Sequence, residues 1–214
     1  MIDLSYASSK LEGSTYNLLE TERLVRFGEE LSDRDRKEAV IILNHKEAIR
    51  FIVDNLASVD LTRRDLFDLH ALLSDGLLAD PADSGRLRRS LVKIGGAAYT
   101  PLDNPYRLNE EFDFLLAKLL EVKDPFEKAF CLFVFLPYLQ VFEDVNKRTS
   151  RVGLNIPLLK RDLCPLSFIT VDERAYVEGT LGVYELNDAA LLKQVFIEGY
   201  VRSAENYRHV RAEL

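Results

Sequence analysis

Residues 140–151 read QVFEDVNKRTSR, and this short polar stretch separates two strongly apolar segments. The segment that ends at Leu139 is apolar almost all round, and the segment from Thr149 to Leu159 is apolar again. A loop that enters a helix N-terminus presents unpaired backbone N–H groups, and the helix dipole adds to their attraction for anions. We interpret residues 140–151 as a helix-loop-helix joint that forms a phosphate-binding cradle.

Three charged side chains of this joint fit that interpretation. Arg148 and Arg151 are three residues apart, so they share one face of the following helix and suit bidentate phosphate contacts. Asp144 lies at the mouth of the loop, where a carboxylate can hold a Mg²⁺ that neutralises a triphosphate. The alternative interpretation is a solvated loop with ordinary surface charges.

Helical periodicity dominates the rest of the chain. Ser32 with Asp35 resembles a capping box before an amphipathic helix, and Thr62 with Asp65 repeats the pattern. Asp124-Pro125 predicts the start of a helix that runs to Leu139, which we expect to be buried on every side. Pro157 should kink or end the helix after the joint. The last helical material is expected over 183–207.

Residues 90–101, SLVKIGGAAYTP, carry β-favouring residues on both sides of Gly95-Gly96, a pair that accepts the positive φ angles of a tight turn. We therefore expect a short two-stranded flap. The predicted fold class is all-α: a helical bundle with a short β-hairpin flap, formed by residues 1–214 as one domain.

Composition excludes several classes of function. The 214 residues are 47% hydrophobic with a formal charge of -7, which allows a well-buried core but gives no electrostatic footprint for nucleic acid. Two cysteines provide neither a disulfide framework nor the ligand cluster of a structural zinc. The first residues lack a signal peptide, and no run of about 18 apolar residues appears. We expect a cytoplasmic protein with no membrane partner.

The joint resembles the signature of the Fic family, HxFx(D/E)GNGRxxR, and its Doc toxin branch, HxFxDANKRT. The residues in register are Phe142, Asp144, Asn146, Lys147, Arg148 and Arg151. Ser8, Glu12 and Gly13 match the inhibitory pattern (S/T)xxxE(G/N) of that family, and the segment from Lys93 to Pro101 resembles its flap.

The resemblance implies a helical Fic bundle that transfers AMP from ATP to a Ser, Thr or Tyr hydroxyl of a target protein. Asp144 would hold Mg²⁺, and Arg151 would contact the γ phosphate unless Glu12 reaches it first. The remaining nucleotide-binding residues would be Glu143, Asn146, Lys147 and Arg148.

Two further segments gain roles from the resemblance. Residues 1–20 would form the inhibitory segment, in which Glu12 pairs with the second arginine; relatives with this segment often dimerise, which makes a homodimer a further expectation. The flap would hold the target protein as an added strand. Its residues are Ile94, Gly95, Gly96, Tyr99 and Thr100.

The match breaks where the family has its catalytic histidine. Gln140 occupies that position, and an amide cannot take the proton of an attacking hydroxyl, a loss that costs about 10²–10⁴ in rate. Val145 replaces a glycine or alanine and disfavours positive φ. His70 lies on an apolar helix face and is expected to pack in the core, and a carboxylate such as Glu143 would be a weak base for a hydroxyl.

Four hypotheses follow. The first is an adenylyltransferase inhibited by Glu12, with transfer weak or lost through Gln140. The second is a nucleotide-sensing module without catalysis, the third a Doc-like transferase of the γ phosphate, and the fourth a purely structural helical protein.

Overall fold

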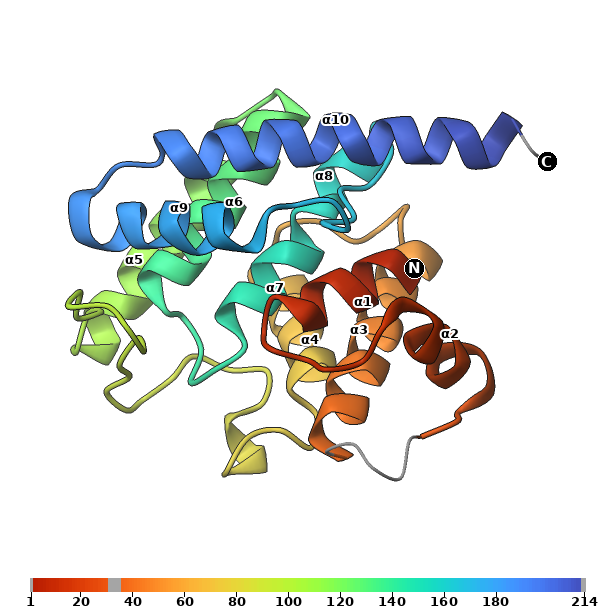
Figure 1. The fold of residues 1–214 in the computed structure, drawn as a ribbon. Helices are drawn as coiled ribbons and strands as arrows, with labels where there is room; N and C mark the ends of the chain where they lie inside the picture. Colours follow the sequence, from red (N-terminus) through yellow and green to blue (C-terminus); the bar gives the residue numbers. More distant parts are fainter. Residues whose placement is uncertain (1, 31–35, 213–214) are drawn as a thin grey trace.

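The computed structural model describes residues 2–30 and 36–212, which Figure 1 shows as an assembly of helices. In these two ranges no residue forms a β-strand, so the all-α prediction is confirmed and the expected hairpin is not observed. The elements are α1 (Ile2–Lys10), α2 (Leu18–Phe27), α3 (Arg36–Asp54), α4 (Arg63–Ser74), η1 (Pro81–Asp83), α5 (Pro105–Glu121), α6 (Pro125–Leu139), α7 (Asn146–Gly153), α8 (Asn155–Leu159), α9 (Glu173–Leu186) and α10 (Ala190–Ala212).

Helix α6 is the central element, because it packs against α5, α7, α8 and α9. Leu132 and Leu136 on its inner face have no exposed surface. The expectation that α6 is buried on every side is wrong, since Phe135 is 46% exposed. Side chains of α5 and α6 form the walls of a groove of about 310 Å³ there instead of filling it.

Capping side chains set the starts of the helices that carry the site. The carboxylate of Asp124 accepts the N–H groups of Phe126 and Glu127, both at 2.9 Å, and Pro125 takes the first helical position as predicted. Thr62 caps α4 by accepting the N–H of Asp65 at 3.1 Å. The predicted cap at 32–35 lies outside the described residues.

The predicted effect of Pro157 is visible as a break between α7 and α8 at Leu154. A proline has no N–H to donate to the carbonyl four residues before it, so the hydrogen-bond ladder is interrupted at Gly153. A second break separates α9 from α10 at Asn187, which adopts φ +52.

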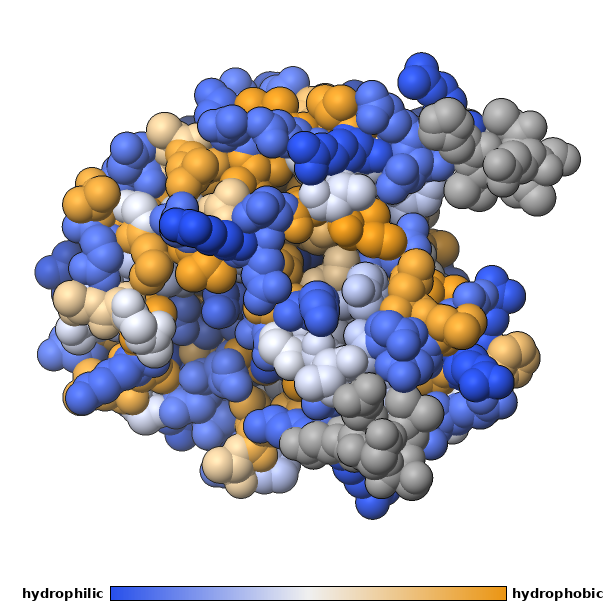
Figure 2. Space-filling view, viewed as in Figure 1, coloured by the Kyte–Doolittle hydropathy of each residue, from blue (hydrophilic) through white to orange (hydrophobic). Residues whose placement is uncertain are grey.

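The surface combines polar and apolar areas. Figure 2 shows apolar side chains that interrupt the polar surface over α9 and α10. Among the described side chains of these two helices, the large apolar residues that are exposed are Val177, Leu186, Leu191, Ile197 and Val201. None of the helices in residues 2–30 and 36–212 combines the length and the apolar content needed to cross a membrane.

Helices α9 and α10 pack closely because Gly179 has no side chain. A Cβ at Gly179 would lie 2.9 Å from the backbone nitrogen of Leu192. We predict that Gly179→Ala lowers the free energy of unfolding by about 1–3 kcal/mol, because the backbone of α10 must move. Gly95→Ala is the matched control, since its Cβ would meet nothing within 4 Å. Chemical denaturation measures both, and equal losses would contradict the close approach.

Candidate functional site

The loop between α6 and α7 is shaped by the side chain of Asn146. Its Oδ1 accepts the N–H of Phe142 at 2.9 Å, and its Nδ2 donates to the carbonyl of the same residue at 2.9 Å. Nδ2 also donates to Oε1 of Gln140 at 3.1 Å. The side chain of Asn146 is therefore committed to closing the loop, and its 3% exposure leaves little surface for a ligand.

His70 supports the loop from α4. Its Nδ1 accepts the N–H of Gly85 at 3.0 Å, so Nε2 carries the proton and donates to the carbonyl of Asp144 at 3.2 Å. Its ring stacks on Phe142 with centroids 3.9 Å apart. Burial lowers the pKa of His70 to about 4, which keeps the ring neutral. The prediction of a packed, hydrogen-bonded histidine is confirmed.

Val145 stands at the turn into α7 with φ +66 and is 2% exposed. A β-branched residue in this region costs on the order of 1–3 kcal/mol. The valine therefore did not prevent the positive φ, but the loop retains strain at this position. Its N–H donates to Oδ1 of Asp144 at 2.6 Å, which helps to hold the turn.

Arg151 is fully buried in α7 and is surrounded by partners from two other helices. Its Nη2 donates to Oε1 of Glu12 at 2.6 Å and to the carbonyl of Ser8 at 3.1 Å. Its Nε donates to the hydroxyl of Ser8 at 2.9 Å, and its Nη1 donates to the hydroxyl of Tyr176 at 2.8 Å. Residues near the N-terminus thus occupy most of this guanidinium.

Glu12 follows the end of α1 and pairs with two cations of α7. Besides Arg151, its carboxylate lies 4.0 Å from Nζ of Lys147. Burial by itself would raise the pKa of Glu12, but Arg151 and Lys147 outweigh that effect and hold the pKa below its usual range. Gly13, at φ +88, then turns the chain away from the pair. The resemblance implied that Glu12 pairs with the second arginine of the motif, and the hydrogen bond from Arg151 to Glu12 is that contact.

Arg148 is 6% exposed but poorly satisfied. Its Nη1 is buried without a hydrogen-bond partner, and its Nη2 lies 3.8 Å from Oδ2 of Asp144. Burial lowers the pKa of Arg148, and the nearby charge of Arg151 adds to that effect. Arg148 and Asp144 line a hollow of about 300 Å³ together with Glu12. This hollow offers a cation to an incoming anion.

Asp144 is the exposed carboxylate of the site, with 67% of its side chain accessible. Within the described ranges no three His, Cys, Asp or Glu side chains gather as a ready-made metal site. Mg²⁺ commonly takes one or two protein carboxylates and completes its shell with phosphate oxygens and water. An exposed carboxylate beside a candidate phosphate pocket fits that coordination.

Gln140 ends α6 with φ +48 and has both ends of its amide engaged. Its Nε2 donates to the carbonyl of Pro137 at 2.6 Å, and its Oε1 accepts from Asn146. The position predicted for a base therefore holds a group with no titratable atom, fixed in place.

The flap differs from the predicted hairpin. A turn forms at Gly95-Gly96, where the N–H of Ala97 donates to the carbonyl of Ile94 at 3.3 Å and Gly96 adopts φ +79. Strand pairing does not follow, because the N–H groups of Ala98 and Tyr99 donate to the carboxylate of Glu185 in α9.

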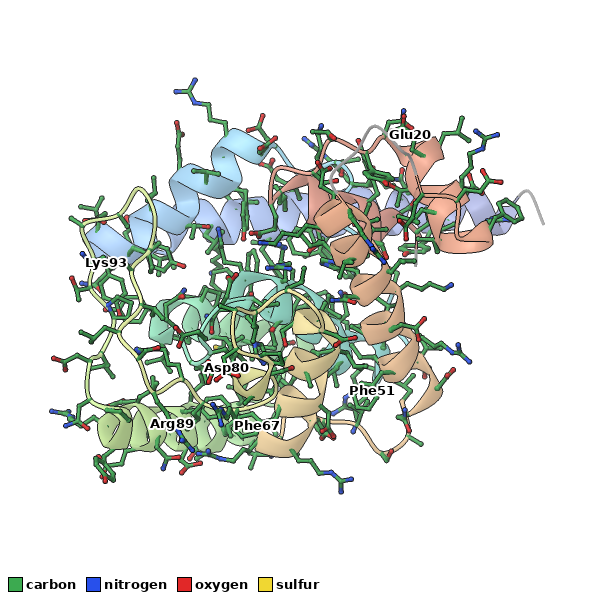
Figure 3. The ribbon with its side chains drawn as sticks, turned by 90° about the horizontal axis from the view of Figure 1, so that it is seen from below. Glu20, Phe51, Phe67, Asp80, Arg89 and Lys93 are labelled. Atoms are coloured by element: carbon green, nitrogen blue, oxygen red, sulfur yellow. The ribbon has the colours of Figure 1, made fainter. Side chains whose placement is uncertain are left out.

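The side chain of Tyr99 anchors this segment from the other side. Its ring stacks on Tyr138 with centroids 4.6 Å apart, and its hydroxyl donates to the carbonyl of Tyr138 at 3.0 Å. Figure 3 follows the segment along the outside of the helices from Arg89 to Lys93. Gly95, Gly96 and Thr100 are exposed, so they lie on the accessible side of the flap.

Comparison with known proteins identifies the family of this site. The sequence model of the Fic/DOC family matches residues 60–158. The chain belongs to the Fic/DOC family. The Fic/DOC match includes the flap and the whole of 140–151, whereas Ser8 and Glu12 lie outside it.

Two relatives whose names contain Fic are consistent with the match to the family model. The chain is 26% identical over 189 residues to protein adenylyltransferase fic-1 of Caenorhabditis elegans, covering 86% of this chain and 36% of that protein. It is 27% identical over 176 residues to protein adenylyltransferase Fic of Nematostella vectensis, covering 81% of this chain and 41% of that protein. The chain therefore spans only about a third to two fifths of these relatives.

Solved structures share the fold. Fic-1 from Caenorhabditis elegans superposes with a TM-score of 0.81 at 21% identity over 99% of this chain and 63% of that one. A Fic family protein from Desulfovibrio desulfuricans gives the same TM-score of 0.81 at 17% identity over 100% of this chain and 66% of that one. At such identities the likeness establishes the Fic fold.

Arg88 is a residue of the Fic site that the sequence gave no reason to select. It is 3% exposed, and its Nε donates to the carbonyl of Gln140, while Nη1 donates to the carbonyl of Ser90 at 2.8 Å. Nη2 reaches the carbonyl of Leu102, on the far side of the flap. Glu143, which the resemblance assigned to the nucleotide, accepts a hydrogen bond from the hydroxyl of Ser90. Both side chains fasten the flap to the Fic motif.

We predict that Arg88→Met destabilises the Fic fold by about 2–4 kcal/mol, because three carbonyl oxygens lose their donor and the flap loses its attachment. The neighbouring Arg89 is exposed, so Arg89→Met is the matched control and should leave stability within about 0.5 kcal/mol of wild type. Denaturation together with limited proteolysis of 90–102 measures both effects. Similar behaviour of the two variants would show that Arg88 does not anchor the flap.

Proposed function

We propose that this chain binds ATP with Mg²⁺ and is related to protein adenylyltransferases, held in an inhibited form by Glu12. In this proposal AMP transfer to a hydroxyl of a target protein is weak or lost, because Gln140 takes the place of the catalytic histidine. The names of the relatives support the reaction class, and the geometry of 140–151 supports the nucleotide.

The observation that carries the proposal is the state of the two arginines. Arg148 has a buried donor without a partner, and Arg151 is fully buried against a carboxylate that is not part of the Fic motif. A buried charged donor without a partner is costly, so Arg148, whose Nη1 is unpaired and whose nearest carboxylate is the exposed Asp144 at 3.8 Å, favours an additional anionic partner. A triphosphate would supply oxygens to Arg148 directly and to Arg151 once Glu12 has moved.

The backbone and Asp144 complete the proposed nucleotide site. The N–H groups at the start of α7 (Asn146–Gly153) attract negative charge, and Arg148 of the same helix lines the hollow beside Asp144. Asp144 would hold Mg²⁺, which supplies positive charge to the phosphates when bound. Lys147, whose side chain is 41% exposed, is free to exchange Glu12 for a phosphate oxygen.

A second candidate is a nucleotide-sensing module without catalysis. The engaged amide of Gln140 favours it, because neither end of that side chain is available to move a proton. Under both candidates ATP competes with Glu12 for Arg151. In the transferase, a target protein would bind along the exposed side of the flap, near Gly95 and Thr100.

We expect Glu12→Gly to bind ATP–Mg²⁺ about tenfold more tightly than wild type, since it removes a hydrogen-bonded charge that competes for Arg151. Adding Arg148→Met in the Glu12→Gly background should abolish the gain. Isothermal titration calorimetry measures the three dissociation constants. Absence of heat from both wild type and Glu12→Gly would exclude nucleotide binding at this site.

Restoring the histidine tests the transfer step. In the Glu12→Gly background, Gln140→His should raise protein labelling from α-labelled ATP by about 10²–10⁴, because a base can then accept the hydroxyl proton. Label from γ-labelled ATP instead would favour the Doc-like transfer. If Gln140→His binds ATP without labelling any protein, the nucleotide-sensing module is the better assignment.

A further inference from the structure

His45 of α3 is completely buried where α1, α3 and α7 meet, the three helices that lie side by side near the centre of Figure 1. Its Nδ1 lies 2.7 Å from the carbonyl oxygen of Ile41, and its Nε2 lies 2.8 Å from the hydroxyl of Ser8. No role follows for this residue from the Fic motif, because it lies outside both the 140–151 segment and the flap.

The two partners of His45 define its proton positions. A carbonyl oxygen can only accept, so Nδ1 must carry the proton and donate it to Ile41. In a neutral ring Nε2 is then an acceptor, and Ser8 must donate its hydroxyl proton to His45. Burial lowers the pKa of His45 to about 3, and the charges of Arg148 and Arg151 also oppose its protonation.

The orientation of the Ser8 hydroxyl determines what it offers to Arg151. Because its proton points at His45, a lone pair of Oγ is available for the Nε–H of Arg151, 2.9 Å away. The carbonyl of Ser8 accepts from Nη2 of the same guanidinium at 3.1 Å. A continuous series of hydrogen bonds therefore runs from α3 through α1 to α7.

We propose that His45 is a positioning residue that fixes Ser8 against Arg151 and so holds Glu12 in its inhibitory contact. The proposal rests on the proposed function in one respect, namely that Arg151 serves the triphosphate when Glu12 leaves. With His45 in place, Arg151 presents its Nε and Nη2 edge to α1. Without Nε2 of His45 as an acceptor, the Ser8 hydroxyl is no longer oriented toward His45, although Glu12 is still present. A nucleotide then competes for Arg151 more easily.

A double-mutant cycle between His45 and Ser8 tests this arrangement, with the dissociation constant of ATP–Mg²⁺ as readout. His45→Phe fills the same space without an acceptor and should tighten ATP binding about threefold to tenfold, the effect of one hydrogen bond. Ser8→Ala should act similarly. In the Ser8→Ala background, His45→Phe should produce no further change, because the hydroxyl that it orients is absent.

His45→Gln is the conservative control. Its side-chain oxygen can accept the Ser8 hydroxyl, so affinity close to wild type is expected from this variant. A role in packing alone would give additive effects in the cycle and would not separate Phe from Gln. Unchanged affinity in His45→Phe, or full additivity with Ser8→Ala, would overturn the proposal.

A second readout keeps this test independent of the proposed function. If Glu12→Gly fails to bind ATP, nucleotide binding is wrong, but amide hydrogen exchange over residues 2–13 still reports the docking of α1. His45→Phe should then increase amide exchange in this segment. The double variant with Ser8→Ala should exchange no faster than His45→Phe alone. Equal exchange in wild type and His45→Phe would contradict the positioning role itself.

Discussion

The buried guanidinium of Arg151 is the feature on which the arrangement of this Fic site depends. It joins α7 to Ser8 and Glu12, which lie 143 and 139 residues away in the sequence. Loss of one partner from a buried ion pair typically costs about 3–5 kcal/mol, whereas an incoming anion can replace that partner. The same contact therefore stabilises the closed site and determines what must be displaced to open it.

The two buried arginines of residues 140–151 differ in how many of their N–H groups have hydrogen-bond partners. Arg151 has four hydrogen-bond contacts, while Arg148, one helical turn earlier, retains a buried N–H without a partner. The strained turn at Val145 lies between Asp144 and Arg148, which line one hollow. Strain and an unpaired donor at the same site are expected of a ligand pocket and are costly in a purely structural loop.

Sequence patterns correctly predicted the helix starts and the helix break that depend only on neighbouring residues. The caps at Thr62 and Asp124 and the break at Pro157 depend on residues within one helical turn, so the sequence was sufficient. The apolar face of α6 was predicted too broadly, because exposure of Phe135 depends on how α5 packs beside it. The flap kept its glycine turn, but Glu185, about 90 residues later, took the N–H groups that a hairpin would have used.

Some residues of the candidate site could also be predicted from the sequence, and others could not. Spacing placed Arg148 and Arg151 on one helix face, and the family resemblance added Glu12. Neither could show that the side chain of Asn146 closes the loop. Arg88 and His45 were not selected as site residues, because the partners that matter are the carbonyl of Gln140 for Arg88 and the hydroxyl of Ser8 for His45, both far away in the sequence. No residue-type pattern marks such contacts in a single sequence.

A crystal structure of the Glu12→Gly variant with ATP and Mg²⁺ tests the central claim most directly. The expected result is a triphosphate that contacts both Arg148 and Arg151, with the metal on Asp144. A nucleotide bound elsewhere, or a hollow closed by repacked side chains while Arg148 keeps Asp144 as its nearest anion, would contradict it.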